Sequence, residues 1–447
     1  MSIELSNSLL ESVKKILLKY PLCNHCLGRL FAKLGHGLGN DDRGYSLKLV
    51  LTMELHRIIK DDKDKYKDLL RNLAENGGEP LTKLYEYLYN EAINYRECIL
   101  CKNIISRKYF EKLADKAIEV INEYNATSFL IGVSIDRELQ LKEIEIASES
   151  GLEYSESIKN EIKREVGKIV RDKSGIEPDF NRPDIVVVFD LIGNYDVIVN
   201  PVLLLGRYWK TARNISHVIW ISKGIKKYPY SIEEFFNESL KEVYDAERAI
   251  LHASGREDVD VRMLGTGRPM VLEIKNPRFR LVDYDLLNSL VVSNRVKGEI
   301  IGQASRKHIE LLKMELSKKS KIYKALIYTS EPISEEKLRY LEEFFTDKVI
   351  RQLTPKRILY RKKERLRTRK VYQVKTRYID QHLFEALIRS DGGLYIKELI
   401  SGDNGRTTPS FAEILEVKAY CIELDVIGVE VPLLSQFGEN IYNMINV

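Results

Sequence analysis

Residues 253–278 read ASGREDVDVRMLGTGRPMVLEIKNPR, and they set charged side chains between glycines ahead of an apolar run. The run MVLEI predicts a strand. A charged loop beside a core strand is how a scaffold presents a carboxylate to a substrate. The residues alone leave open a salt-bridged loop without chemistry. Metal binding by the acids is disfavoured, because Arg256 and Arg262 compete for the same carboxylates and no histidine accompanies them.

Four of the five cysteines form two C-x-x-C pairs, in PLCNHCLGR and in RECILCKN. This spacing lets a tight turn aim two sulfurs at one metal, and four thiolates complete a tetrahedral zinc site. We therefore expect a structural zinc held by Cys23, Cys26, Cys98 and Cys101, with helices folded between the two pairs. Such a site needs neither His25 nor His36. A redox disulfide is the alternative.

At 447 residues the chain exceeds one ordinary hydrophobic core, so we expect two or three domains. Helical spacing from Leu9 to Tyr20 leads into the first cysteine pair. The runs TSFLIGVS, DIVVVFDL and YDVIVNP predict strands, and the spacing from Ile158 to Ile169 predicts a helix. A linker is expected at 224–230. The pattern divides the chain into segments 1–105, 106–222 and 228–447, and helix and strand alternate in the second of them.

The composition, 44% hydrophobic and 31% charged, excludes a disordered or collagen-like chain. No run of about 18 uncharged apolar residues is present. The N-terminal MSIELSNSLLESVKK lacks a basic region followed by an apolar stretch. We expect a protein of the cytoplasm without membrane attachment, and nothing in the sequence indicates a protein partner.

The net charge of +5 conceals a basic segment, 351–377, with twelve Lys and Arg residues against one acid, Glu364. Such a segment repels itself unless an anion such as a phosphate backbone neutralises it, although a solvated surface is the simpler alternative. Alternate basic residues from Arg361 to Arg369 would share one face of a strand. Arg207, Lys210 and Arg213 stand three apart beside Tyr208 and Trp209, which predicts a helix. Its basic and aromatic residues suit RNA contact or internal packing.

The order of Gly255, Arg256 and Asp258 resembles the G-R-x-D motif of pseudouridine synthases, and GREDVDVRMLGTGRP is similar to the archaeal and eukaryotic tRNA pseudouridine synthase Ten family. Further matching segments are CNHCLGRLFAKLGHGLGNDDRG, RECILCKN, VNPVLLLGRYWKTARNISH, QLTPKRILYRKK and LYIKELISGDNGRTTPSFAEILE. They run in order through nearly all of the chain. The resemblance implies an α+β fold with a zinc-binding module at 1–105, a THUMP-type RNA-binding domain at 106–222 and a C-terminal pseudouridine synthase catalytic domain at 228–447. It implies as substrate a uridine of the tRNA T loop, at position 54, 55 or both.

The resemblance also implies residue roles. Asp258 is the catalytic carboxylate, Tyr323 stacks on the target base, and Lys397 pairs with the aspartate, with Arg256 as its alternate. Lysine stands where related synthases have arginine, and Leu394 where they have a threonine-like residue, so a point charge replaces a bidentate fork. Residues expected to contact RNA are Tyr323, Arg207, Lys210, Arg213, Arg256, Arg262, Arg357, Arg361 and Arg406. Arg406 is equally suited to anchor its own loop.

Pseudouridine formation breaks the N1–C1′ bond of uridine, rotates the uracil and rejoins it through C5, so no organic cofactor is needed. The base must first be turned out of its stack. Asp258 must be ionised, whether it attacks the sugar, attacks the base or removes a ribose proton. A THUMP-bearing methyltransferase or thiouridine synthase would need a glycine-rich or phosphate-binding loop, which the C-terminal half lacks. An inert RNA-binding protein is disfavoured by Asp258, Tyr323 and Lys397 together.

Overall fold

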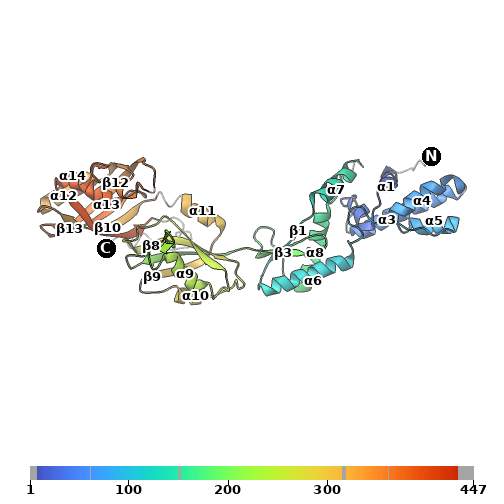
Figure 1. The fold of residues 1–447 in the computed structure, drawn as a ribbon, viewed down its shortest axis with the longest axis horizontal. Helices are drawn as coiled ribbons and strands as arrows, with labels where there is room; N and C mark the ends of the chain where they lie inside the picture. Colours follow the sequence, from blue (N-terminus) through green and yellow to red (C-terminus); the bar gives the residue numbers. More distant parts are fainter. Residues whose placement is uncertain (1–7, 61, 150–152, 315–318, 361, 431–447) are drawn as a thin grey trace. The chain divides into compact units, whose positions relative to one another are not determined.

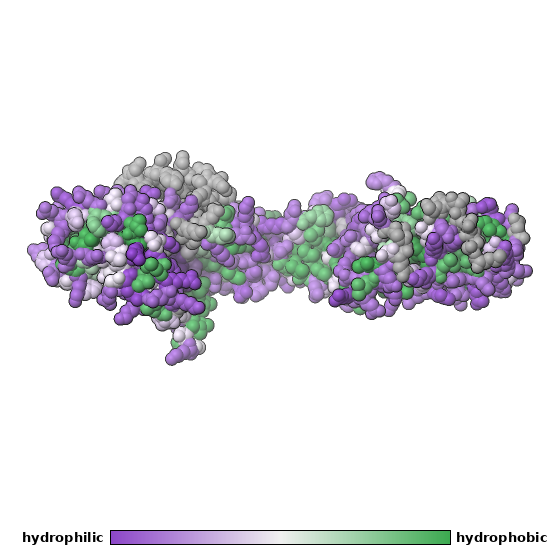
Figure 2. Space-filling view, turned by 90° about the horizontal axis from the view of Figure 1, so that it is seen from above, coloured by the Kyte–Doolittle hydropathy of each residue, from purple (hydrophilic) through white to green (hydrophobic). Residues whose placement is uncertain are grey.

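The computed structural model describes residues 8–60, 62–149, 153–314, 319–360 and 362–430 (Figure 1). The chain divides into two compact units, Met1–Asn200 and Pro201–Val447. Both combine helices with sheets, which confirms the α+β prediction. Among the described helices, none is long and apolar enough to cross a membrane. Figure 2 shows hydrophilic residues over most of the visible surface.

Helices dominate the first part of unit 1. Helix α1 (Ser8–Lys19) buries Val13, Ile16 and Leu17, which confirms the predicted helix. Helix α2 (Asn24–Arg29) follows the first cysteine. The interval before the second cysteine pair is filled, as expected, by α3 (Asn40–Ile59), α4 (Lys67–Gly77) and α5 (Leu81–Tyr89).

A three-stranded sheet with helices forms the rest of unit 1. Its elements are α6 (Arg107–Glu123), β1 (Phe129–Val133), α7 (Arg137–Glu149), α8 (Ile158–Ser174), β2 (Ile185–Phe189) and β3 (Tyr195–Val199). The strand order is β1-β2-β3, with β1 parallel and β3 antiparallel to β2. The predicted strands and the helix from Ile158 are confirmed. One buried cluster runs from α1 to β2, so the cysteine module and this sheet share a core.

Unit 2 is built on a ten-stranded mixed sheet of order β14-β11-β12-β13-β10-β15-β8-β4-β9, with β7 paired to β8. Its strands are β4 (Val202–Lys210), β7 (Arg248–Ala253), β8 (Arg262–Lys275), β9 (Val296–Gln303), β10 (Lys321–Thr329), β11 (Lys348–Leu353), β12 (Leu366–Asp380), β13 (Leu383–Ser390), β14 (Thr407–Thr408) and β15 (Ala419–Val429). Its helices are α9 (Ile232–Leu240), α10 (Tyr284–Leu290), α11 (Arg306–Met314), α12 (Glu335–Phe345), α13 (Ile396–Ser401) and α14 (Phe411–Leu415). A small hairpin, β5 (Ile221–Ser222) and β6 (Ile225–Lys226), stands apart.

Two antiparallel halves of this sheet meet at one short parallel pair, β15 with β8. Asp425 of β15 lies opposite Arg262 of β8. Arg262 donates two hydrogen bonds to that carboxylate, at 2.8 and 2.6 Å. Because the pair is short, this cross-strand ion pair helps to hold the two halves in register.

The predicted helix over Arg207–Arg213 is wrong, because residues Val202–Lys210 form strand β4 between β8 and β9. Leu203 and Leu205 pack into one buried cluster and Leu204 and Tyr208 into another, so both faces of the strand are covered. A strand buried on both faces reads as a continuous apolar run, and the three-residue spacing of its basic residues was misleading. The strand belongs to unit 2, ahead of the expected linker at 224–230.

The basic segment is only partly a strand. Strand β12 begins at Leu366, so Arg367 and Arg369 share a face as expected. Lys363 and Arg365 precede the strand and are exposed. Arg361 lies outside the described residues.

Two glycines let α2 and α3 approach closely. A methyl group on Gly44 would lie 2.0 Å from the carbonyl oxygen of Asn24, and one on Gly28 would lie 1.8 Å from that of Asn40. We predict that Gly44→Ala lowers the free energy of unfolding of this unit by roughly 1–3 kcal/mol, because the added methyl must push the two helices apart. Denaturant unfolding of the full chain measures this change in the free energy of unfolding.

The matched control is Gly167→Ala in α8, where no atom lies within 4 Å of the added methyl. It should leave stability unchanged or raise it by up to about 1 kcal/mol. Equal stability of Gly44→Ala and the parent would contradict the close α2–α3 contact.

Candidate active site and metal centre

The charged loop of the GRED segment connects β7 to β8 and lies beside the parallel β15–β8 join. Gly255 starts the turn in the left-handed region, with φ 78°. Ser254 donates its backbone N–H to Pro269 at 3.1 Å, and Val261 donates to the carbonyl of Asp258 at 3.0 Å. The loop is therefore short and tied at both ends, which limits where the Asp258 carboxylate can point.

A buried ion pair lies beneath this loop. Arg268 and Glu257 are each 1% exposed, and the arginine Nε donates to Glu257 at 2.9 Å. The same arginine donates from Nη1 to the carbonyl of Ser254 at 2.8 Å, and the Tyr208 hydroxyl donates to Glu257 at 3.1 Å. Burial opposes ionisation of Glu257, but the charges of Arg268 and Lys210 outweigh it and lower the pKa of that carboxyl.

Lys210 was expected to contact RNA, and the structure corrects this assignment. The side chain is 1% exposed and donates to the carbonyls of Ile215 at 3.2 Å, Asp258 at 3.0 Å and Val259 at 3.2 Å. Burial lowers its pKa to about 8. The ammonium cannot reach a phosphate and anchors the backbone of the Asp258 loop instead.

A cavity of about 590 Å³ opens over the loop and brings together the three residues that the family resemblance singled out. Asp258, Tyr323 and Lys397 all line it, although they come from the loop, from β10 and from α13. Tyr323 is buried, and burial raises its pKa to about 12, so its phenol stays neutral. The apolar lining consists of Val261, Ile358, Leu394, Ile396, Leu424 and Val426.

The cation paired with Asp258 is Arg357, not Lys397 or Arg256 as expected. The guanidinium Nη1 of Arg357 lies 2.9 Å from Asp258 Oδ2, and its Nε lies 2.6 Å from Glu398. Burial opposes the charge of Arg357, but Glu398 and Asp258 raise its pKa. Lys397 lies 2.5 Å from Asp260 instead. Asp258 and Asp260 point to different cations because they occupy different positions in a tight turn, which sequence spacing alone did not reveal.

Several other basic residues expected to contact RNA are bonded within the protein. Arg262 pairs with Asp425, Arg213 with Glu423 and Asp425, Arg207 with Glu299, and Arg406 with Glu364 and the carbonyl of Thr354. Arg406 thus anchors its own loop. Arg256 is exposed and lines the cavity. RNA contact by these arginines stays a prediction.

Sequence reasoning missed Lys321, Arg268 and Tyr395, which also line the cavity. Lys321 could have been found from the sequence, because it stands two residues before Tyr323 and alternate residues of a strand share one face. Arg268 and Tyr395 had none, because their positions depend on the sheet order.

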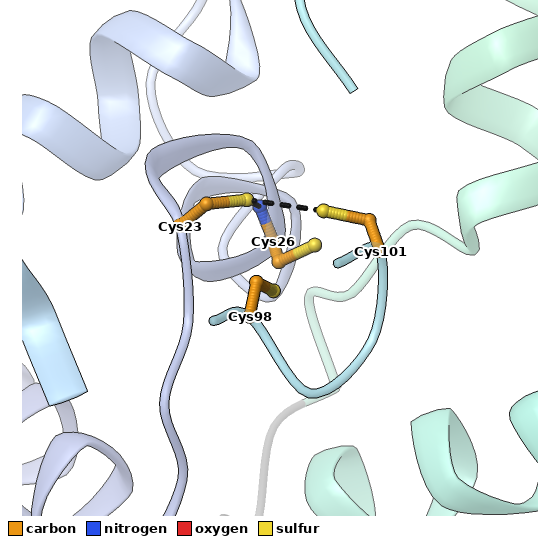
Figure 3. Close-up of side chains that lie close together, drawn as sticks. All are labelled: Cys23, Cys26, Cys98 and Cys101. Atoms are coloured by element: carbon orange, nitrogen blue, oxygen red, sulfur yellow. Dashed lines mark hydrogen bonds between the residues drawn. The ribbon is translucent and has the colours of Figure 1, made fainter. Parts of the chain in front are cut away.

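The four paired cysteines lie together in unit 1, with sulfurs pointing toward one another (Figure 3). All four sulfurs lie within 4.8 Å of one another, and Cys23 Sγ lies 3.4 Å from Cys101 Sγ. The backbone N–H of Cys26 donates to Cys23 Sγ at 3.4 Å, the turn that C-x-x-C spacing predicts. A tetrahedral zinc with bonds of about 2.3 Å holds its sulfurs about 3.8 Å apart, so this donor set fits one metal ion. A sulfur–sulfur bond needs about 2.05 Å, which excludes a Cys23–Cys101 disulfide here.

Arg29 supplies a compensating charge beside the cysteines. Its guanidinium is fully buried and donates from Nη1 to Cys26 Sγ at 3.3 Å. The same side chain lies 3.1 Å from Glu143 and 3.8 Å from Glu161. His25 donates from Nδ1 to the Glu161 carboxylate at 2.9 Å and is not part of the sulfur cluster. The cysteine centre is therefore linked to α7 and α8 through buried charges.

Both units resemble known protein families. Residues 203–430 match the family model described as Pus10, C-terminal, and residues 113–190 match the Pus10 THUMP domain, archaeal. A protein of Thermosphaera aggregans named tRNA pseudouridine synthase Pus10 is 46% identical, covering 95% of this chain and 97% of the relative. Proteins of the same name from Methanocaldococcus jannaschii and Pyrococcus furiosus are 40% and 35% identical, covering 93% and 94% of this chain and 93% and 98% of the relatives.

Solved structures match far less closely. A Cbf5-Nop10-Gar1 complex aligns over 50% of this chain and 47% of that chain, at 18% identity and a TM-score of 0.28.

We predict about one zinc per chain in protein purified under reducing conditions, because the four sulfurs form a complete tetrahedral donor set. Cys98→Ser should lose the metal and destabilise unit 1. Cys421→Ser is the matched control, because Cys421 lies alone on β15 in unit 2 and should not affect metal content. Elemental analysis of the purified parent and both variants measures the zinc content per chain. Parent protein without metal, or with a Cys23–Cys26 disulfide, would overturn the assignment.

Proposed function

The chain belongs to the Pus10 family of tRNA pseudouridine synthases, and from this premise we propose that it isomerises uridine in the tRNA T loop, at position 54, 55 or both, with Asp258 as the catalytic carboxylate. Asp258, Arg357 and Tyr323 converge on one cavity, and this convergence supports the proposal. The cavity also has an apolar wall, which suits a base that has left its stack.

The Asp258 side chain is 48% exposed and lines the cavity, and its loop is held by backbone hydrogen bonds. Attack on the sugar, attack on the base and removal of a ribose proton all require the ionised carboxylate. Arg357 orients the carboxylate through its charge and its 2.9 Å contact with Oδ2. Lys397 contacts Asp260, two residues from Asp258, and we propose that it holds the Asp260 end of the loop.

Tyr323 supplies the aromatic face for the extruded uracil. Its ring lines the cavity on the same face of β10 as the core residues Ala325 and Ile327. Stacking of a base on such a ring contributes roughly 1–3 kcal/mol, which offsets part of the cost of unstacking. The reaction conserves all atoms of the substrate, so the proposal includes no organic cofactor.

Binding of tRNA is assigned to positive charge around the cavity and to the THUMP domain of unit 1. Lys362, Lys363 and Arg365 are exposed in the middle of the basic segment. Arg367 lies over the ring of Tyr395 at 5.4 Å, which places a cation and an aromatic ring at the cavity wall. Zinc is the proposed ion of the cysteine centre, with a structural role, and the cytoplasm is the proposed compartment.

The decisive variant is Asp258→Asn, which keeps the shape of the side chain and removes its negative charge. We predict no pseudouridine, with tRNA affinity and melting temperature close to the parent because the side chain is half exposed. The assays are nucleotide-resolution detection of pseudouridine and thermal unfolding.

Asp260→Asn is the internal control and should keep measurable turnover, because Asp260 pairs with Lys397 outside the proposed reaction. Activity in Asp258→Asn with none in Asp260→Asn would mean that the wrong carboxylate was chosen. Full activity in both variants would remove the proposed mechanism.

A second prediction separates the two cations. Arg357→Met should slow single-turnover isomerisation by roughly 100-fold, because the carboxylate loses the partner that orients it. Lys397→Met should have a smaller effect, since that ammonium contacts Asp260. Arg357→Lys restores the positive charge but not the planar guanidinium that can contact two carboxylates, and it should recover part of the rate. A larger loss in Lys397→Met than in Arg357→Met would contradict the pairing seen in the structure.

A further inference from the structure

One buried cation of the cavity has no hydrogen-bond acceptor or ion-pair partner among the described residues. Lys321 is 7% exposed and lines the same cavity as Asp258 and Tyr323. Within the described part of the chain, no group accepts a hydrogen bond from its Nζ and no carboxylate lies within salt-bridge distance of it. Its Nζ keeps contact with the open space of the cavity, where a ligand can supply the acceptor that the described part of the chain does not.

The position of the ammonium is well defined. A methyl group on Gly255 would lie 3.3 Å from Lys321 Nζ and 3.5 Å from Arg268 Nη1, so the amine lies against the start of the Asp258 loop. Lys321 and Tyr323 are two residues apart on one face of β10, about 7 Å along the strand. The amine and the ring therefore enter the cavity from the same face of β10.

The other cations of the cavity are engaged or exposed. Arg268 bonds to Glu257 and Ser254, Arg357 to Asp258 and Glu398, and Lys397 to Asp260. Lys362 and Arg367 lie over the ring of Tyr395 nearer the solvent. Of the described cavity residues, Lys321 alone is a buried cation without an acceptor.

The proposed reaction creates a charge that such a cation would stabilise. When the N1–C1′ bond breaks, its electron pair leaves with the uracil, whose negative charge spreads over O2 and O4. The same base then forms the C5–C1′ bond, one proton leaves C5 and one is taken up at N1, so nothing is consumed. Attack on the base also places negative charge on a carbonyl oxygen. Each route therefore needs a positive group at the uracil carbonyls.

We propose that Lys321 is a catalytic residue that donates to a carbonyl oxygen of the extruded uracil and stabilises the negative charge of the base during isomerisation. This inference rests on the proposed function, because it requires a uracil on Tyr323. The charged groups that face the amine are Arg268 of β8 and Glu257 of the adjoining loop. Strands β13 and β15 flank Lys321 with Ser390 and Val429, which carry no charge.

The test compares Lys321→Met with Lys324→Met. Lys324 lies on the opposite face of β10 and pairs with Glu385 at 2.8 Å, so it is a matched lysine outside the cavity. Lys321→Met should slow single-turnover pseudouridine formation by about 100-fold to 1,000-fold, the usual effect of losing one donor to a developing anion. Its melting temperature should not fall, because a buried unpaired charge is removed. Lys324→Met should match the parent.

The pH profile of kcat/KM provides a readout that a packing role would not change. Burial and Arg268 lower the pKa of Lys321 to about 7. Catalysis needs the protonated amine, so the parent rate should fall as pH rises above that value. Lys321→Arg should move this fall to higher pH and Lys321→Met should abolish it, while Lys324→Met keeps it.

Several outcomes would overturn the inference. Parent-like rate and pH profile in Lys321→Met would do so. Weaker tRNA binding with an unchanged single-turnover rate at saturating enzyme would also do so, because Lys321 would then hold a phosphate. If Lys321→Met does not fold, Lys321→Gln replaces it and must show the same slow rate. Failure of the proposed function looks different, because the parent and Lys324→Met would then make no pseudouridine either.

Discussion

The buried ion pair between Arg268 and Glu257 is the interaction on which the rest of the site depends. Both side chains are 1% exposed, so each charge requires the other. The arginine reaches the backbone at Ser254, and Lys210 reaches it at Asp258. A loop that contains three acids is thereby held in one conformation, with one acid turned inward as a support and the next turned to the cavity.

The three neighbouring acids of the loop have different partners and different roles. Glu257 supports the loop, Asp258 faces Arg357, and Asp260 faces Lys397. Tyr323 and Lys321 enter from β10 on the other side of the β15 strand, at the place where the two antiparallel halves of the sheet join. The parallel β15–β8 pair thus brings the carboxylate and the base-binding wall together from segments far apart in the chain.

Local patterns in the sequence predicted the elements that depend on local physics. Short apolar runs marked β1, β2 and β3, helical spacing marked α1 and α8, and C-x-x-C spacing marked the sulfur cluster. The strand at Val202–Lys210 was missed because its basic residues repeat every three positions, although its unbroken apolar start indicates a strand covered on both faces. The Arg357–Asp258 pair could not be predicted, because it depends on the order of strands that no local pattern encodes.

The central claim is that this chain converts a T-loop uridine to pseudouridine. The most direct measurement incubates purified parent protein with an unmodified tRNA transcript, without added cofactor, and maps pseudouridine at each nucleotide. The account predicts pseudouridine at position 54, 55 or both and at no site outside the T loop. An unmodified T loop after complete incubation with folded, tRNA-binding protein would contradict it.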